Sequence, residues 1–156
     1  MLDRITPVIL TFNEAPNIER TLARLDWASR IVIVDSGSMD ETVELARRNP
    51  RVDLRERPFD EHARQWNYAI TETNVRSEWV LALDADYVLT EDFLGEISRL
   101  DSHPDVTGYE ARFIYYVFGQ PLRGSLYPPV TVLFRAGRGH YVQDGHTQRL
   151  VVAGQV

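Results

Sequence analysis

The chain of 156 residues contains no cysteine and no lysine. Without cysteine it has neither a disulfide framework nor a thiolate metal site, a composition that fits a reducing compartment. Because all 17 basic residues are arginines, no mechanism that depends on an ammonium group is available, whether a P-loop lysine or a Schiff base. The missing lysine therefore counts against enzymes that hold a phosphate with that residue.

Long hydrophobic runs are also missing. No stretch approaches the roughly 20 apolar residues of a transmembrane helix, and the start of the chain lacks the charged and apolar regions of a signal peptide, so we expect a cytoplasmic protein. The formal charge is −6 with scattered acids, which argues against a nucleic-acid partner. With 44% hydrophobic residues, the chain is long enough for a single domain over residues 1–156.

Apolar runs and helical patterns alternate along residues 1–105. Short strands are predicted where β-branched and apolar residues cluster, and helices where apolar residues recur at helical spacing after a proline or a capping residue. In chain order these are strand 7–10, a helix from Pro16 with Ile18, Leu22 and Leu25 on one face, strand 31–34, a helix opened by a capping box at residues 38–41, strand 51–56, helix 60–71, strand 78–83, and a helix capped by Thr90 and ended by Ser102-His103-Pro104. This order predicts an α/β fold with a mainly parallel sheet flanked by helices.

The amino-acid composition of the chain changes after residue 105. Residues 109–118 and 130–135 are aromatic and β-branched, and glycines and prolines separate them. They read as strands and turns. The sequence therefore predicts a β-rich C-terminal third joined to the α/β part.

Three polar clusters follow predicted strands directly: residues 11–14 (TFNE), residues 35–38 (DSGS) and residues 84–86 (DAD). In an open α/β sheet, ligands bind beyond the carboxyl ends of the strands. Capping and turn chemistry explains any single cluster equally well. Three clusters on one edge favour a ligand site.

Asp84 and Asp86 lie two residues apart, so in an extended segment both carboxylates point to one side. Two like charges there call for a cation, and hard oxygen ligands suit Mg²⁺ or Mn²⁺, with coordination positions left for substrate phosphates. The plainer alternative is a strand end with two solvated acids that cap the next turn.

Four segments, in this order and spacing, resemble family 2 glycosyltransferases of the GT-A fold: PVILTFNEAPNIERTL, IVIVDSGSMDET, RQWNYAI and WVLALDADYVLT. The closest likeness is to bacterial enzymes that add sugars to the lipopolysaccharide core, and it covers nearly the whole chain. It implies a nucleotide-sugar donor, Mn²⁺ or Mg²⁺, and a glycan or glycolipid acceptor. Residues 1–105 would bind the donor, and residues 106–156 would form the acceptor side.

Carried over residue by residue, the resemblance implies that Thr11, Asn13, Glu14 and Asp35 line the nucleotide pocket. Asp84 would lie near the ribose and the metal, and Asp86 would bind the metal and the diphosphate. Arg64 and Asn67 fall where relatives place an arginine and an asparagine near the nucleotide, whereas Trp66 is expected in the helix core.

The rival is a haloacid-dehalogenase-like phosphatase, with Asp84 as nucleophile and Asp86 as acid/base. That motif normally lies on the first strand, and those enzymes usually hold the phosphate with a lysine. Sugar nucleotidyltransferases share a similar sheet but begin with a glycine- and arginine-rich loop, which ILTFNEAPN is not. A third alternative is a nucleotide-binding module without catalysis.

Inverting sugar transfer needs a general base on the acceptor side. Asp144 is the candidate, although Asp144-Gly145 is also a strong hairpin-turn signal. His146 is either a third metal ligand or a local hydrogen-bonding residue. Arg135 and Arg149 could balance a diphosphate or simply be solvated.

Relatives of this kind usually continue past residue 156 with further acceptor-site elements, so the chain is either a fragment or a minimal version. A lipid acceptor would bring it to the inner face of the plasma membrane, although no basic amphipathic helix supports such a contact.

Overall fold

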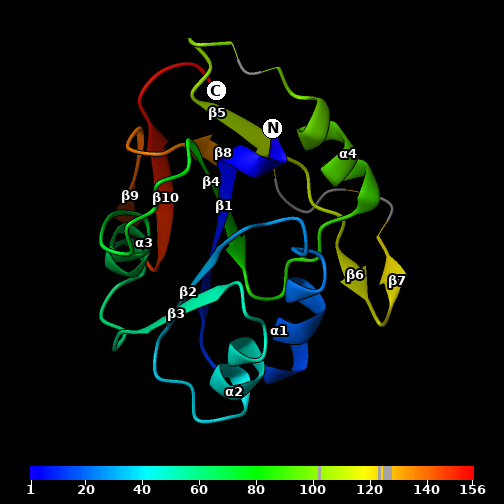
Figure 1. The fold of residues 1–156 in the computed structure, drawn as a ribbon, viewed down its shortest axis with the longest axis vertical. Coiled ribbons are helices and arrows are strands. Elements are labelled where there is room, and N and C mark those ends of the chain that lie inside the picture. Colours follow the sequence, from blue (N-terminus) through cyan, green and yellow to red (C-terminus); the bar gives the residue numbers. More distant parts are fainter. Residues whose placement is uncertain (102, 123, 125–127) are drawn as a thin grey trace.

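The computed structural model describes residues 1–101, 103–122, 124 and 128–156. Its centre is a six-stranded sheet in the order β3-β2-β1-β4-β8-β5 (Figure 1). The strands are β1 (Ile5–Thr11), β2 (Ile31–Asp35), β3 (Val52–Glu56), β4 (Trp79–Asp84), β5 (Gly108–Ala111) and β8 (Val130–Arg135). Strands β1 to β4 are parallel, β8 runs antiparallel to β4, and β5 runs antiparallel to β8. The predicted α/β fold with a mainly parallel sheet is confirmed.

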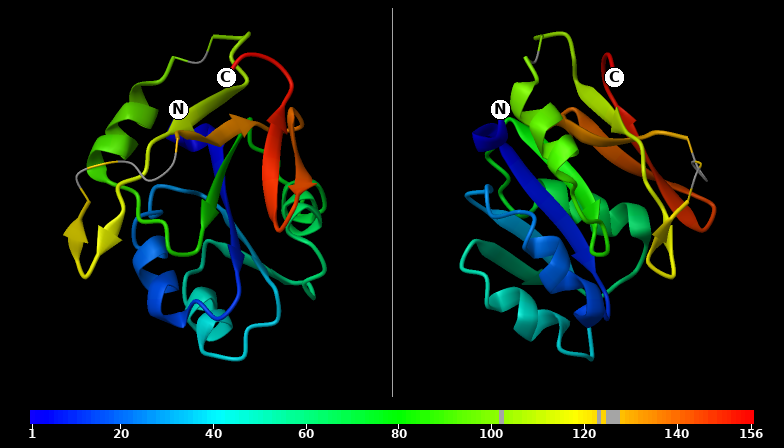
Figure 2. Two further views of the ribbon diagram at one scale, coloured as in Figure 1. Left: turned by 180° about the vertical axis from the view of Figure 1, so that it is seen from behind. Right: turned by 90° about the vertical axis from the view of Figure 1, so that its right-hand side faces the viewer.

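Helices and a hairpin cover the two faces of this sheet. The remaining elements are a 3₁₀ turn η1 (Leu2–Arg4), α1 (Ala15–Leu22), α2 (Thr42–Arg47), α3 (His62–Thr71), α4 (Glu91–Arg99), β6 (Tyr116–Val117), β7 (Gln120–Pro121), β9 (Gly139–Asp144) and β10 (Thr147–Val152). Helices α1, α2 and α4 lie on one side, and α3 with the β9–β10 hairpin lies on the other (Figures 1 and 2).

The alternation of side chains along the strands divides the core into two layers. Odd-numbered residues of β1, β2 and β4, such as Ile9, Ile33 and Leu81, pack with α1, α2 and α4. Even-numbered residues, such as Val8 and Val80, pack with α3 and β9. Because both faces are buried, these strands are apolar almost throughout, as expected for parallel strands between two layers.

Two helix starts differ in their chemistry. The Thr90 hydroxyl accepts a hydrogen bond from Phe93 N (3.1 Å), so the predicted cap of α4 is confirmed. The predicted capping box at residues 38–41 is wrong, because the Ser38 hydroxyl donates to Asp35 Oδ1 (2.6 Å) instead. Asp40 Oδ1 accepts from Thr42 N (3.0 Å) where α2 begins. Helix α4 ends at Arg99, just before the predicted stop at Ser102-His103-Pro104, of which Ser102 lies outside the described residues.

The C-terminal third is β-rich as predicted, but residues 109–118 do not form one strand. Strand β5 ends at Ala111, and after it the chain leaves the sheet to form the separate two-stranded hairpin β6–β7. The predicted strand over residues 130–135 matches β8. Within the described ranges, no helix is both long and apolar enough to cross a membrane.

Candidate functional site

The register of the parallel strands brings the three polar clusters together. Thr11, the last residue of β1, pairs with Asp35, the last residue of β2. On the other side of β1, Leu10 pairs with Asp84, the last residue of β4. Three adjacent strands thus end at one level, and the prediction that the clusters share one sheet edge is confirmed. This edge is the usual ligand position in an open α/β sheet.

Asp35 organises the loop that follows β2. Its carboxylate is buried (1% exposed). One oxygen accepts from the hydroxyls of Thr11 (2.9 Å) and Ser38 (2.6 Å), and the other accepts from Gly37 N (2.9 Å) and Ser38 N (2.8 Å). Gly37 has φ +92°, a conformation that suits glycine. A ligand at this edge would therefore meet a loop that Asp35 has already shaped.

Asn13 and Glu14 join the β1–α1 loop to the β2–α2 loop. Asn13 adopts a left-handed conformation (φ +55°). Its backbone N–H donates to Ser38 Oγ (2.8 Å), and its side-chain oxygen accepts from Met39 N (2.8 Å). Glu14 N donates to Thr42 Oγ1 (2.7 Å). These contacts lock the two loops together, so the edge is preorganised.

Asp84 and Asp86 share the exposed side of a tight turn. Tyr87 N donates to Asp84 O (3.0 Å), so the chain turns here, and the expectation of an extended segment is wrong. Ala85 points inward, where its carbonyl accepts from the Thr21 hydroxyl (2.6 Å). The two acids are left facing solvent, close enough for their charges to interact.

Partial desolvation by the surrounding protein raises the pKa of the Asp84 carboxyl above its ordinary value. Water reaches this side chain, but the protein around it removes much of its hydration, and this is the main cause. The charges of Asp86 and Glu14 raise the pKa further. The Tyr87 hydroxyl, which hydrogen-bonds to Asp84, and the nearby His62 oppose the shift. The surroundings of Asp84 therefore disfavour its ionised form.

The raised pKa predicts how Asp84→Asn changes the stability of the metal-free protein. A carboxyl with a raised pKa in the folded state penalises folding above its ordinary pKa, because the unfolded chain ionises more easily. The variant should be more stable than the native protein at pH 7. The gain should shrink as the pH falls toward the ordinary carboxyl range. Urea unfolding at pH 7 and pH 4 measures this, and an equal difference at both values would contradict the assignment.

Tyr87, His62 and Tyr141 are site residues that sequence reasoning missed. The Asp84 charge raises the pKa of both tyrosines, in each case after the larger effect of burial. Tyr141 also stacks on Trp66, with ring centroids 5.1 Å apart. Trp66 is buried, so its predicted place in the helix core is confirmed. Strand β9 therefore brings an aromatic hydroxyl to the carboxyl end of β4.

Asn67 holds β9 against α3. Its side-chain amide donates to Tyr141 O (2.8 Å), and its side-chain oxygen accepts from Tyr141 N (2.8 Å). At the start of the helix, Ala63 N donates to Gln143 Oε1 (3.2 Å). The β9–β10 hairpin is thus fixed to the helix beside the candidate site by polar contacts as well as by packing.

Asn67→Ala should loosen this attachment. Both lost hydrogen bonds are part-buried, and each contributes about 1 kcal/mol, so we expect a loss of about 2 kcal/mol in the free energy of unfolding. Amide exchange in β9 should accelerate more than exchange in β1. Glu72→Gln, at an exposed position just past the same helix, is the matched control and should change neither quantity. Unchanged protection of β9 would show that packing alone holds the hairpin.

Asp144 and His146 lie at the tip of the β9–β10 hairpin. Asp144 pairs with Thr147, and Gly145 (φ +61°) makes the turn, so the turn interpretation of Asp144-Gly145 is confirmed. Asp144 is exposed, 3.7 Å from Arg149 Nε. In the described part of the chain, no three His, Asp or Glu side chains converge closely enough to hold a metal, so His146 does not complete a set with Asp84 and Asp86.

Arg64 and Arg135, which the sequence singled out, both lie beside acidic residues other than Asp84 and Asp86. Arg64 is exposed, 3.7 Å from Asp60 and 3.9 Å from Glu61. Arg135 pairs in register with Trp79, at the opposite end of β4, and forms an ion pair with Glu78. Arg135 therefore cannot balance charge at the carboxyl edge.

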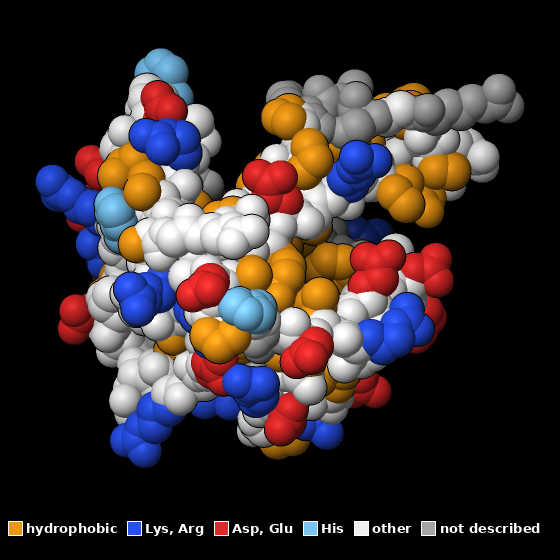
Figure 3. Space-filling model, turned by 90° about the horizontal axis from the view of Figure 1, so that it is seen from above, with side chains coloured by type: hydrophobic (Ala, Val, Ile, Leu, Met, Phe, Trp, Pro, Cys, Tyr) orange, Lys and Arg blue, Asp and Glu red, His pale blue; other side chains and the backbone are white. Residues whose placement is uncertain are grey.

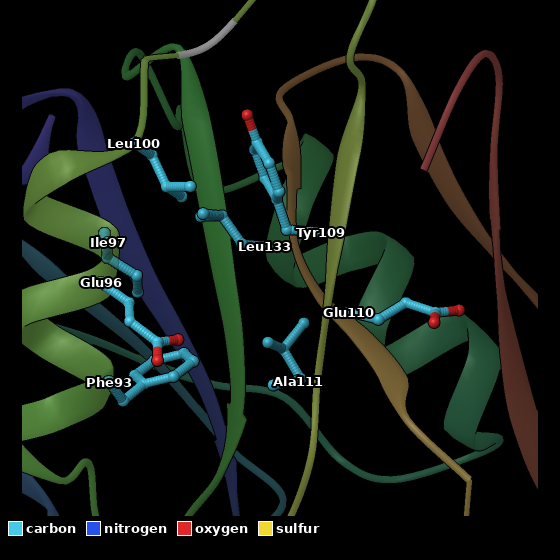
Figure 4. Close-up of a pocket in the computed structure, with 9 residues that line it drawn as sticks. Phe93, Glu96, Ile97, Leu100, Tyr109, Glu110, Ala111 and Leu133 are labelled. Carbon is cyan, nitrogen blue, oxygen red and sulfur yellow. The ribbon is translucent and has the colours of Figure 1, made fainter.

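A separate cavity of about 110 Å³ lies between α4 and the strands β5 and β8 (Figure 4). Most of its lining is apolar, including Phe93, Ile97 and Leu133. Figure 4 shows the Glu110 carboxylate pointing away from it. Because α4 packs on the sheet through this space, the cavity is a packing gap and not part of the polar edge.

Comparison with known proteins relates the chain to glycosyltransferases. An uncharacterised glycosyltransferase of Rickettsia bellii (strain RML369-C) is 33% identical over 98 residues, which cover 62% of this chain and 32% of that protein. The succinoglycan biosynthesis protein ExoA of Rhizobium meliloti (strain 1021) is 33% identical over 95 residues, covering 55% and 29%. The chain thus spans about a third of the length of these relatives.

Solved structures share the fold at low sequence identity. Glucosyl-3-phosphoglycerate synthase from Mycobacterium tuberculosis, in complex with Mn²⁺, UDP and glucosyl-3-phosphoglycerate, is 16% identical with a TM-score of 0.54, covering 68% of this chain and 42% of that one. A 4-diphosphocytidyl-2C-methyl-D-erythritol synthase is 17% identical with a TM-score of 0.61, covering 86% and 76%. The model of the family described as glycosyl transferase family 2 matches residues 6–146. This match covers most of the chain, which therefore belongs to glycosyl transferase family 2.

Proposed function

We propose that the chain binds the nucleotide-sugar donor of a metal-dependent, inverting glycosyltransferase. The observation that carries this proposal is the alignment of Thr11, Asp35 and Asp84 at the ends of three adjacent parallel strands. Support comes from the structural relative described with UDP and Mn²⁺. The family match also leaves the phosphatase alternative, with Asp84 as nucleophile, without support.

Asp84 and Asp86 are the residues that would hold the metal. Carboxylate oxygens are the ligands that Mn²⁺ and Mg²⁺ prefer, and the raised pKa of Asp84 marks a place where positive charge is favourable. The metal would supply charge neutralisation for the departing diphosphate. In this proposal Thr11, Asn13, Glu14 and the loop shaped by Asp35 receive the nucleotide, in line with the family resemblance.

Asp144 is the proposed general base. An acceptor hydroxyl would attack the anomeric carbon from the side opposite the leaving diphosphate while Asp144 takes its proton, which inverts the configuration. The polar anchoring of β9 by Asn67 and Gln143 would keep this carboxylate within reach of the acceptor.

The proposed acceptor is a glycan or glycolipid, and the sequence resemblance points to the lipopolysaccharide core. The complete reaction is proposed for the protein as a whole, since the chain spans about a third of the length of its curated relatives.

Thermal-shift measurements with UDP, GDP and dTDP, each with and without Mn²⁺, test donor binding. We expect one nucleotide to raise the melting temperature in the presence of Mn²⁺ and to do so much less in its absence, because only a ligand of the folded state stabilises it. No stabilisation by any of the three would remove the donor-site assignment. Binding without transfer from the matching nucleotide sugar to any glycan acceptor would instead favour a nucleotide-binding module.

A further inference from the structure

An uncharged aromatic hairpin stands apart from the sheet. Residues 113–122, here called the aromatic hairpin, include β6 and β7 and contain no acidic or basic side chain. Its exposed large hydrophobic residues are Ile114, Tyr116, Val117, Phe118 and Leu122. Figure 3 shows hydrophobic side chains gathered on the side where Figure 1 draws β6 and β7. Exposed apolar surface of this kind marks an interaction site.

Both faces of the aromatic hairpin are open. Tyr116 and Val117 are consecutive residues of β6, so their side chains point to opposite faces. Tyr116 is nevertheless 64% exposed and Val117 47% exposed. A protein groove would cover one face of a two-stranded ribbon, whereas a bilayer interface surrounds an inserted tip on all sides. Exposure on both faces therefore favours a lipid surface.

The turn of the hairpin presents an aromatic ring at its tip. Phe118 (φ +49°) and Gly119 (φ +74°) both adopt the left-handed conformation between β6 and β7. A bulky residue is rare in that conformation, where glycine or asparagine is usual, and such strain is a marker of function. The Phe118 side chain is fully exposed (101%), so packing within the described structure does not explain its presence.

Positive charge lies at the base of the hairpin. Arg112 immediately precedes it, is exposed, and has no ion-pair partner among the residues that the structure describes. Aromatic side chains favour the interfacial region of a bilayer, and arginine favours anionic headgroups. An aromatic tip with an arginine at its base therefore suits an anionic bilayer. The chain as a whole is negative (−6), so insertion of the tip must supply most of the affinity.

The hairpin begins beside the candidate site. Phe113, its first residue, packs on Tyr87 with ring centroids 4.8 Å apart, and Tyr87 hydrogen-bonds to Asp84. A surface bound by the hairpin would therefore be held next to the acids proposed to bind the donor. This continuity suits an acceptor whose sugar is carried on a lipid.

We propose that the aromatic hairpin inserts into the interfacial region of an anionic bilayer and holds the site against a lipid-linked acceptor. The acceptor part rests on the proposed function, whereas the bilayer contact does not. Flotation with vesicles of 70% phosphatidylethanolamine and 30% phosphatidylglycerol tests the contact directly. The chain should float with these vesicles.

Removing the tip should remove the binding. The double variant Val117→Ser, Phe118→Ser should bind at least roughly tenfold more weakly, because insertion of a single large apolar side chain contributes about that factor. Met39→Ser is the control: Met39 is 87% exposed but lies on the β2–α2 loop, so its replacement should leave flotation unchanged. Arg112→Gln should weaken binding to the anionic vesicles but not to vesicles of phosphatidylcholine alone.

Three outcomes would overturn the proposal: no flotation of the native chain, flotation that the double variant retains, or self-association that the double variant abolishes while vesicles stay unbound. The last outcome would assign the hairpin to a second copy of the chain. Nucleotide stabilisation in the presence of Mn²⁺ is measured separately without vesicles. A failed donor site and a failed membrane contact therefore give different results.

Discussion

Replacing Asp86 with asparagine is expected to lower the affinity for UDP in the presence of Mn²⁺ by at least about 100-fold. Mutation of a residue that only hydrogen-bonds to a metal ligand already lowers metal affinity by about tenfold to 100-fold, and Asp86 is proposed as a ligand itself. The carboxylate faces solvent beside Asp84, and asparagine keeps its size while removing the charge that a hard cation requires. Titration calorimetry with and without Mn²⁺ measures the change. The variant should bind UDP weakly and to the same extent in both conditions.

Asp92→Asn is the matched control for Asp86→Asn. Asp92 is an exposed acid six residues further along, in the first turn of α4, and neutralising it removes the same charge from the chain. Its binding of UDP with Mn²⁺ should equal that of the native protein. If Asp86→Asn also binds normally, the acid pair does not hold the metal.

Asp35→Ala is expected to cause the largest loss of stability among single changes at the edge, roughly 3–5 kcal/mol in the free energy of unfolding. The variant would leave the buried hydroxyl of Thr11 and the part-buried backbone amides of Gly37 and Ser38 without their acceptor. Urea unfolding at neutral pH, with a separate measurement of UDP binding, checks this result.

Two further variants test whether the loss of stability comes from the buried carboxylate of Asp35. Asp35→Asn keeps one acceptor oxygen but turns an N–H₂ group toward backbone donors, so it should lose an intermediate amount of stability. Asp26→Ala, at an exposed position between α1 and β2, should change stability by less than about 0.5 kcal/mol. A loss below about 1 kcal/mol for Asp35→Ala would show that the loop rearranges without its carboxylate.

The strands and the shared edge could be predicted because their signals are local. Residues 31–34 are apolar without interruption, which is typical of a strand buried on both faces, and polar residues follow the apolar runs directly. Once the strands are parallel and adjacent, their carboxyl ends must meet. Thr11, Asp35 and Asp84 were therefore predictable as neighbours without any knowledge of side-chain contacts.

Three features that complete the site could not be predicted from strand and helix patterns. Tyr141 feels the charge of Asp84, and its backbone is held by Asn67, which lies 74 residues earlier in the chain. Ser38 has the spacing of a helix cap, but the buried carboxylate of Asp35 competes for its hydroxyl and prevails. The orientation of Asp84 depends on the turn closed by Tyr87 N and Asp84 O. The alternation of side chains along an extended strand does not predict this turn.

Paramagnetic broadening by Mn²⁺ tests the central claim most directly. With UDP and Mn²⁺ bound, amide signals should broaden at the carboxyl ends of β1, β2 and β4, around Thr11, Asp35 and Asp84. Signals at the opposite end of β4 and in β5, around Trp79 and Gly108, should stay sharp. Broadening centred anywhere else, or none when UDP is added, would contradict a donor site at this edge.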